Sequence, residues 1–319
     1  MNKITILTKP PKNFFSIFRF YLIDWLKIAV KRILFIPNYG PQAVLESLIR
    51  GFDKLKVDYQ LNPKTDKVSD PVCVISGVDA LKWAIEAKRK GQIKKIIAGP
   101  NIVVTPEDAG GILLDEKIDL VIVPSQWVKD FYASFKPEFN KKIRVWPAGV
   151  EICPQSREKR EGCLIYKKKV DKELFDFIIE CLESQGINYK LIKWGRYRKK
   201  RYFDLLNKVK FMIYLSESES QGIALQEAWM RDIPTLVWNR GYWKWKNYEW
   251  HESSSAPYLT KDCGIFFRDK NDFKNKFDIF IRNLSNFSPR EHSLKNFIDE
   301  ISASNYLKII NEPIENYDK

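Results

Sequence analysis

Two glutamates flank a single glycine in residues 211–238, which read FMIYLSESESQGIALQEAWMRDIPTLVW. Glu219 and Glu227 are separated by seven residues, and Gly222 lies between them. A carboxylate can accept hydrogen bonds from two neighbouring hydroxyl groups, such as those of a ribose or a hexose. A pair of carboxylates that faces one point can therefore hold a polyol ligand.

The surrounding residues predict the elements that must position this pair. Residues 212–215 form a short apolar run, typical of a strand, and the apolar residues after Gly222 have helical spacing. The first amide N–H groups of such a helix lack internal partners and lie at the positive end of its dipole, so they favour an anion. Glu219 then precedes the helix and Glu227 lies inside it, so one ligand can touch both. The alternative is an acidic surface turn before an ordinary helix.

This segment resembles the donor site of retaining glycosyltransferase family 4, whose pattern is Ser, two residues, Glu, two residues, Gly, four residues, Glu-Ala and a later proline. The residues in register with that pattern are Ser216, Glu219, Gly222, Glu227, Ala228 and Pro234. The chain departs from it at Ser220, where a glycine is usual, and at Asp232 and Ile233, which replace another glycine. The resemblance implies an α/β GT-B fold, with two Rossmann-like, doubly wound domains facing a cleft and a C-terminal helix that crosses back to the N-domain.

Other segments carry the resemblance along most of the chain. Residues 120–132 (LVIVPSQWVKDFY) resemble the last strand of the N-domain with the helix after it, and residues 143–151 (IRVWPAGVE) resemble the passage into the second domain. Residues 32–55 resemble the first strand, glycine loop and helix of the family. The resemblance therefore implies that Gly40, with Pro41 beside it, covers the donor phosphates from the N-domain.

The resemblance also implies roles for the residues of the second domain. Glu227 is expected to bind the ribose and Glu219 the transferred sugar. Lys167 and Lys172 align with the family's diphosphate-neutralising arginine and lysine, although the adjacent lysines 168 and 169 leave this register open. The remaining donor contacts are expected around the glycine, from Ser218, Gln221, Gly222, Ile223 and Ala224.

The acceptor side is less defined by the sequence. Pro100 and Asn101, in the segment AGPNIVV, follow an expected strand and are acceptor-side candidates. The family often has a histidine in this part of the N-domain, and the chain has none there, so no catalytic base is assigned. The resemblance implies transfer from a nucleotide diphosphate sugar, with retention, to a glycan or lipid-linked glycan.

The length and composition of the chain limit the class of protein that it can be. The chain has 319 residues and a mass of 37.6 kDa, about two domains' worth. We expect an N-terminal domain at 1–150, a nucleotide-sugar domain at 151–288, and terminal helices at 289–319 that pack back towards the N-domain. The cysteines are five and widely spaced, which favours a reduced, cytoplasmic interior. With two histidines and no DxD triplet, neither a metal site nor any cofactor besides the donor is expected.

The net charge of +14 allows three classes of anionic partner: nucleic acid, an anionic membrane surface, or charged substrates. No nucleic-acid-binding motif accompanies the basic patches, so nucleic acid is not expected. Residues 14–30 are apolar except for Ser16, Arg19, Asp24 and Lys27. Such a helix is too short and charged to span a membrane, and it either packs on the first domain or lies peripherally on the inner face of a membrane.

Further alternatives remain open from the sequence. A GT-B subunit that binds a sugar nucleotide or a partner without turnover is suggested by the reduced glycine loop and the missing histidine. A basic nucleic-acid-binding protein would use residues 196–201 (RYRKKR) and the aromatic tract 238–250 (WNRGYWKWKNYEW). The aromatic tract itself is interpreted either as a platform for a sugar or base or, preferably, as an insertion that covers the core.

Overall fold

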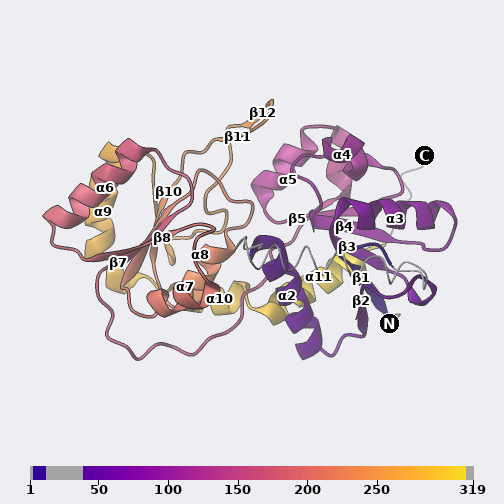
Figure 1. Cartoon of the computed structure of the whole chain (residues 1–319), viewed down its shortest axis with the longest axis horizontal. Coiled ribbons are helices and arrows are strands. Elements are labelled where there is room, and N and C mark those ends of the chain that lie inside the picture. The colour runs from indigo at the N-terminus through magenta and orange to yellow at the C-terminus, as the bar shows by residue number, and fades with distance from the viewer. Residues whose placement is uncertain (1–2, 12–38, 314–319) are drawn as a thin grey trace. The chain divides into compact units, whose positions relative to one another are not determined.

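The computed structural model describes residues 3–11 and 39–313 (Figure 1). The chain divides into two compact units, one of Met1–Gly149 with Asp299–Lys319 and one of Val150–Ile298. Each unit is built on a parallel sheet, as the resemblance to a fold with two Rossmann-like domains implies. The helix expected at residues 14–30 and the strand expected near Ile33 lie outside the described residues.

The first unit holds a sheet of six parallel strands in the order β2-β1-β3-β4-β5-β6. Its strands are β1 (Ile4–Leu7), β2 (Tyr59–Leu61), β3 (Val72–Ser76), β4 (Ile96–Asn101), β5 (Leu120–Val123) and β6 (Ile143–Val145). Its α-helices are α2 (Tyr39–Lys54), α3 (Val78–Arg89), α4 (Asp108–Gly111), α5 (Gln126–Ala133) and α11 (Asp299–Ile310). Short 3-10 turns are η2 (Thr65–Lys67), η3 (Ile112–Leu114) and η4 (Pro137–Lys142).

The second unit holds a parallel sheet of five strands in the order β13-β10-β9-β7-β8. These strands are β7 (Cys163–Lys167), β8 (Tyr189–Lys193), β9 (Phe211–Leu215), β10 (Thr235–Trp238) and β13 (Gly264–Phe267). Its helices are α6 (Lys172–Ser184), α7 (Lys199–Leu206), α8 (Ile223–Met230), α9 (Lys270–Arg282), η5 (Leu284–Asn286) and α10 (Pro289–Asn296). An antiparallel hairpin of β11 (Trp243–Trp245) and β12 (Tyr248–Trp250) stands apart from this sheet (Figure 1).

Helices cover both faces of the second sheet, which explains why its inner strands are nearly continuous apolar runs, whereas the edge strand β8 (YKLIK) carries two lysines. Alternate residues of the strands enter two separate cores, as side chains do on opposite faces of a strand. One core packs the strands against α6 and α9, and the other packs them against α7 and α8. Figure 1 shows α6 beside α9, and α7 with α8 and α10, in the same grouping. The carboxyl ends of the strands are therefore left as the edge at which loops can build a site.

The last helix completes the first unit. The α11 helix packs against α2, where Phe52, Trp146 and Tyr306 are buried side by side. The two helices approach closely at Gly51, because a Cβ atom there would lie 2.4 Å from the carbonyl oxygen of Asp299. The division of the chain thus places α11 with the first unit and α10 with the second, within the segment 289–319 that we expected to form terminal helices together.

No helix among residues 3–11 and 39–313 is long and apolar enough to cross a membrane.

Candidate functional site

The acidic turn, residues 216–222 (SESESQG), lies at the carboxyl end of β9, between that strand and α8. Gly222 is the residue before α8 and has a φ of 84°, in the left-handed region that glycine adopts without strain. Its carbonyl accepts the amides of Leu225 at 2.9 Å and Gln226 at 3.2 Å, which starts the helix. The sequence prediction of a strand, a turn and a helix beginning near Gly222 matches these bounds.

Glu219 is fixed by donors from three positions. Its Oε1 atom accepts hydrogen bonds from the Tyr214 hydroxyl at 2.8 Å, the Ser216 hydroxyl at 2.9 Å and the Lys168 ammonium at 2.9 Å. Lys168 also donates to Oε2 at 2.9 Å. Only 12% of the Glu219 side chain is exposed, so this carboxylate is held at the surface of the loop instead of projecting into solvent.

A layer of tyrosines supports this carboxylate from below. Tyr214 is buried and stacks on Tyr166 with ring centroids 4.8 Å apart. Tyr166 in turn shares a hydrogen bond of 2.8 Å with the hydroxyl of Tyr197, and Tyr202 donates to the carbonyl of Ala224 at 2.6 Å. Burial, followed by the charge of Glu219, raises the pKa of Tyr214 well above its usual value. Its hydroxyl therefore stays protonated and acts as a donor.

Glu227 forms the second half of the predicted pair. It lies in α8, and its Oε1 atom is 2.8 Å from the Nζ atom of Lys199, the first residue of α7. The Glu227 side chain is 12% exposed and that of Lys199 is 39% exposed. Each glutamate of the pair is thus matched by a lysine, one from the loop after β7 and one from α7.

The structure shows which lysine lies beside Glu219, a choice that the sequence left open. Lys167 places its ammonium 3.5 Å from the ring centroid of Phe175, and burial lowers its pKa. Lys168 is instead the lysine beside Glu219. Lys172 begins α6, where it pairs with Asp176 at 2.5 Å and its side chain is 89% exposed. Lys168, and not Lys167, therefore lies at the acidic turn.

The other predicted donor residues lie around the same turn. The carbonyl of Ser218 accepts the Ser216 hydroxyl at 3.1 Å, and the buried Gln221 donates to Gln226 at 2.8 Å. Ile223 and Ala224 form the first turn of α8 and are half-buried. Gln226 is fully buried with its Nε2 atom unpaired in the described part of the chain.

The acidic turn is also tied to the insertion between β10 and β13. The amide of Glu219 donates to the carbonyl of Ser254 at 2.8 Å, and Arg240 donates to Glu217 at 2.7 Å. Asn239 accepts the amide of Ser255 at 3.1 Å, which closes the base of the insertion. The β11–β12 hairpin is therefore anchored at both of its ends near Glu219.

The candidates of the first unit lie at two places in that unit. Gly40 and Pro41 are exposed in the first turn of α2. Pro100 and Asn101 end β4, and the Nδ2 atom of Asn101 is buried without a partner in the described residues. The unpaired amide makes Asn101 the more suitable of these two for a polar ligand.

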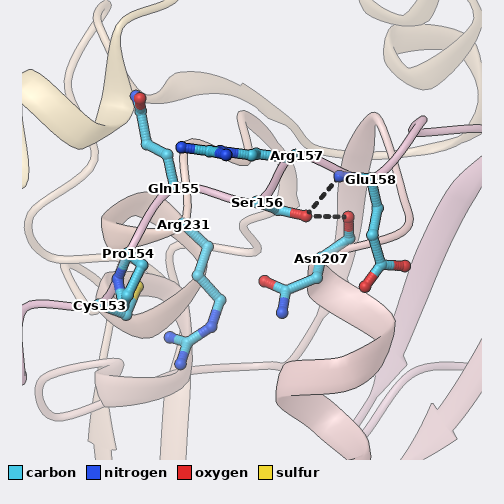
Figure 2. A pocket seen from close by; sticks show the side chains of 8 residues that line it. All are labelled: Cys153, Pro154, Gln155, Ser156, Arg157, Glu158, Asn207 and Arg231. Atoms are coloured by element: carbon cyan, nitrogen blue, oxygen red, sulfur yellow. Dashed lines mark hydrogen bonds between the residues drawn. The ribbon is translucent and has the colours of Figure 1, made fainter.

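A pocket of about 520 Å³ lies elsewhere in the second unit. Its lining residues are Cys153, Pro154, Gln155, Ser156, Arg157, Glu158, Asn207 and Arg231. Figure 2 shows the Ser156 hydroxyl pointing to the carbonyl of Asn207, with which it makes a hydrogen bond of 3.2 Å. Asn207 and Arg231 follow the C-terminal ends of α7 and α8. The pocket is therefore at the opposite end of α8 from Gly222 and Glu219.

No group of three or more His, Cys, Asp or Glu side chains suited to a metal ion occurs within residues 3–11 and 39–313. The five cysteines, Cys73, Cys153, Cys163, Cys181 and Cys263, are all free thiols. Burial raises the pKa of Cys73 and Cys263 to about 12.

Comparison with known proteins gives no match to a protein-family model and no match to a curated protein sequence. Solved structures do match. The chain is similar to the lipopolysaccharide outer core galactosyltransferase WaaB in its apo form, with a TM-score of 0.60 and 13% identity over 97% of this chain and 99% of that one. It is similar to AviGT4, a glycosyltransferase of avilamycin A biosynthesis, with a TM-score of 0.51 and 10% identity over 97% and 96%.

A third match is S. aureus TarM in complex with fondaparinux, alpha-GlcNAc-glycerol and UDP, with a TM-score of 0.50 and 14% identity over 84% of this chain and 59% of that one. At these identities the matches establish the fold. The chain has an α/β GT-B fold. This confirms the predicted fold class.

Proposed function

We propose that this protein is a glycosyltransferase that moves a sugar from a nucleotide diphosphate sugar to an acceptor hydroxyl, with retention of configuration and without a metal. The observation that carries the proposal is the pair of largely buried carboxylates, Glu219 and Glu227, at the two sides of the N-terminus of α8. Its GT-B neighbours include glycosyltransferases, one of them solved with UDP. The resemblance of the acidic turn to the family 4 donor site supports the same assignment.

The proposed donor contacts divide the ligand between side chains and backbone. Glu227 accepts hydrogen bonds from the ribose, and Glu219 accepts them from the transferred sugar. The amides that begin α8 face the diphosphate, together with Lys168 and Lys172. Stabilising the negative charge that develops on the leaving diphosphate is the largest catalytic contribution that these residues can make.

The two lysine pairs give the site its electrostatic balance. Lys168 and Lys199 neutralise the two carboxylates. A bound sugar can replace one lysine contact with hydroxyl donors, because a carboxylate accepts several hydrogen bonds at once. The ammonium of Lys168 can then turn to a phosphate oxygen. When a donor binds in this way, the carboxylate and the ammonium each exchange one partner for another, and neither charge is left unpaired. This limits the desolvation cost of donor binding.

The acceptor is proposed by its chemical class and not as an individual molecule. The acceptor is a hydroxyl of a glycan or a lipid-linked glycan, and Asn101 is the candidate for binding it. The acceptor hydroxyl attacks from the face that the leaving group vacates and gives its proton to a phosphate oxygen, so no histidine is required. A lipid-linked acceptor would bring the basic protein to the inner face of an anionic membrane.

The first experiment is a thermal-shift screen of UDP, ADP and their hexose conjugates, followed by turnover with and without glycan acceptors. Glu227→Ala is expected to abolish turnover and to change the melting temperature little, because its ion pair with Lys199 reaches the surface. Glu173→Ala is the matched control, since Glu173 is 84% exposed and pairs with Lys270 on α9. Full activity of Glu227→Ala would contradict the proposal, and donor binding without turnover would indicate a binding subunit.

A further inference from the structure

Tyr214 donates to Glu219 from a position that is set by the core. It lies in β9, its exposed fraction is 2%, and its side chain belongs to the core between the sheet, α7 and α8. The ring stacks on Tyr166 at 4.8 Å with an interplanar angle of 17°. A ring packed in this way has no alternative rotamer, so its hydroxyl occupies a fixed point beneath the acidic turn.

The packing of this site requires the ring and not the hydroxyl. Neighbouring residues of β9 that face the same core or the opposite one are apolar, such as Met212 and Ile213. A phenylalanine would fill the same space and keep the stack with Tyr166. The hydroxyl instead makes a hydrogen bond of 2.8 Å with Oε1 of Glu219. The polar atom is therefore directed at the carboxylate of the acidic turn.

We propose that Tyr214 is a positioning residue for Glu219, whose hydroxyl holds the carboxylate in the orientation that receives the hydroxyls of the transferred sugar. This inference rests on the proposed function, in which Glu219 binds that sugar. Tyr214 lies outside the Ser, Glu, Gly and Glu-Ala positions of the acidic-turn pattern, so the spacing of the motif does not reveal it.

The other donors to Glu219 do not make Tyr214 redundant. Lys168 is 28% exposed and is bonded to both carboxylate oxygens. In the proposed function it turns towards the diphosphate when a donor binds. Ser216 belongs to the turn itself, and its hydroxyl also bonds the carbonyl of Ser218. When Lys168 turns away, Tyr214 is the contact that ties Oε1 to the rigid sheet. Its contribution should be greatest in the donor complex.

Tyr214→Phe tests the inference, with affinity for UDP and for UDP-hexoses measured separately. We expect the variant to keep the wild-type melting temperature within a few degrees and the wild-type affinity for UDP. Affinity for the UDP-hexose that the wild type uses, and kcat/KM with it, should fall about tenfold, the effect of losing one hydrogen bond to a charged group. A general loosening of the fold would instead weaken UDP and UDP-hexose binding together.

Two matched controls come from the same tyrosine layer. Tyr166→Phe removes a buried hydroxyl that bonds Tyr197, and Tyr202→Phe removes one that bonds the carbonyl of Ala224. Both should keep the wild-type ratio of UDP-hexose to UDP affinity. In a Glu219→Ala background, Tyr214→Phe should have no further effect on UDP-hexose binding, because the side chain that it positions is gone.

The outcomes separate this inference from the function on which it rests. If the wild type uses a UDP-hexose and Tyr214→Phe matches the two tyrosine controls, the inference is wrong and the proposed function stands. If Tyr214→Phe and Glu219→Ala have additive effects, Tyr214 does not act through Glu219. If the wild type binds none of the sugar nucleotides, the proposed function fails and the inference fails with it.

Discussion

At the scale of single residues, the sequence was most informative where side-chain type alone determines the chemistry. Glu219 and Glu227 could be selected because they are in register with the family 4 donor pattern, since the same spacing alone also fits an ordinary acidic surface turn. Their partners could not be selected in the same way. Lys199 belongs to a run of basic residues that resembles a solvated surface, and only the packing of α7 against α8 brings it to Glu227.

The choice between Lys167 and Lys168 shows why a register is hard to assign from sequence. Successive side chains at the end of a strand point to opposite faces of the sheet. Lys167 is directed to α6 and the ring of Phe175, whereas Lys168 is directed to Glu219. Three consecutive lysines have the same side-chain chemistry, so the sequence does not show which of them faces Glu219. The residue at which β7 ends decides this.

Lys168→Ala is therefore expected to lower kcat/KM for sugar transfer about 100-fold, because it removes a cation from the developing diphosphate charge. Lys167→Ala is the control and should change kcat/KM less than threefold, an effect of the size expected for a cation at a partly exposed site. Lys168→Arg should restore part of the activity, since a guanidinium also pairs with carboxylate and phosphate. Steady-state kinetics of the three variants checks this, and equal losses in both alanine variants would refute the assignment.

One departure from the family pattern is explained at the same scale. Asp232 occupies the place of a usual glycine and has a φ of 61°, in the left-handed region. Aspartate tolerates this region better than most residues. Its carbonyl accepts the guanidinium of Arg160 at 2.9 Å, which further holds the turn. Asp232 therefore adopts, between α8 and β10, a backbone conformation that glycine favours.

At the scale of elements, the inner strands of both sheets are marked by continuous apolar runs, because a strand that is covered on both faces has no polar alternation. The edge strands β2 (YQL) and β8 (YKLIK) lack such runs. The aromatic tract was the exception. Interpreted as an insertion covering the core, it forms instead the β11–β12 hairpin, and its Trp243, Trp245, Tyr248 and Trp250 are absent from the two cores of the second unit. Aromatic residues at alternate positions indicate a strand, but they do not say whether it joins a main sheet.

The start of α8 makes a prediction about backbone conformation. Gly222→Ala should destabilise the protein by about 1 kcal/mol, the cost of a left-handed conformation for a residue with a Cβ atom. The new Cβ would also lie 3.2 Å from the Cδ1 atom of Leu225, which pushes on the first turn of the helix. Because the amides of that turn are proposed to face the diphosphate, UDP affinity should fall as well.

Gly186→Ala supplies the matched control for this change. Gly186 follows α6, has a φ of 65°, and has no atom within 4 Å of the position of an added Cβ. It should show the same loss of stability by thermal unfolding without loss of UDP affinity by calorimetry. If both variants bind UDP equally well, the N-terminus of α8 does not hold the nucleotide.

At the scale of the whole molecule, the chain passes between its two units at residues 149–150 and 298–299. The two passages lie together, because the amide of Val150 donates to the carbonyl of Phe297 at 2.6 Å and Val150 is bridged to Ile298. The sequence predicts the first passage near Glu151, where its pattern resembles the passage into a second domain. The second could not be placed within the terminal helices, since α10 and α11 follow one another with only a two-residue break.

This arrangement makes the first unit dependent on both ends of the chain. The carboxylate of Asp299 is fully buried and accepts bonds of 2.6 Å and 3.1 Å from the Arg50 guanidinium on α2. Removing α11 would take away both of these hydrogen bonds of Arg50 and expose the ring of Phe52, which packs against Tyr306. The second unit has no comparable dependence, because it is continuous in sequence from Val150 to Ile298 and contains both cores of its sheet.

A fragment of residues 150–298 is therefore expected to fold by itself, with a cooperative thermal transition followed by circular dichroism. It should bind UDP with an affinity close to that of the whole chain, because Glu227, Lys168 and the N-terminus of α8 all belong to it. Sugar transfer should be lost, since the acceptor candidates Pro100 and Asn101 are in the first unit. Glu227→Ala in the same fragment is the control and should bind UDP more weakly. A folded fragment that binds no UDP, beside a whole chain that does, would place nucleotide binding outside the acidic turn.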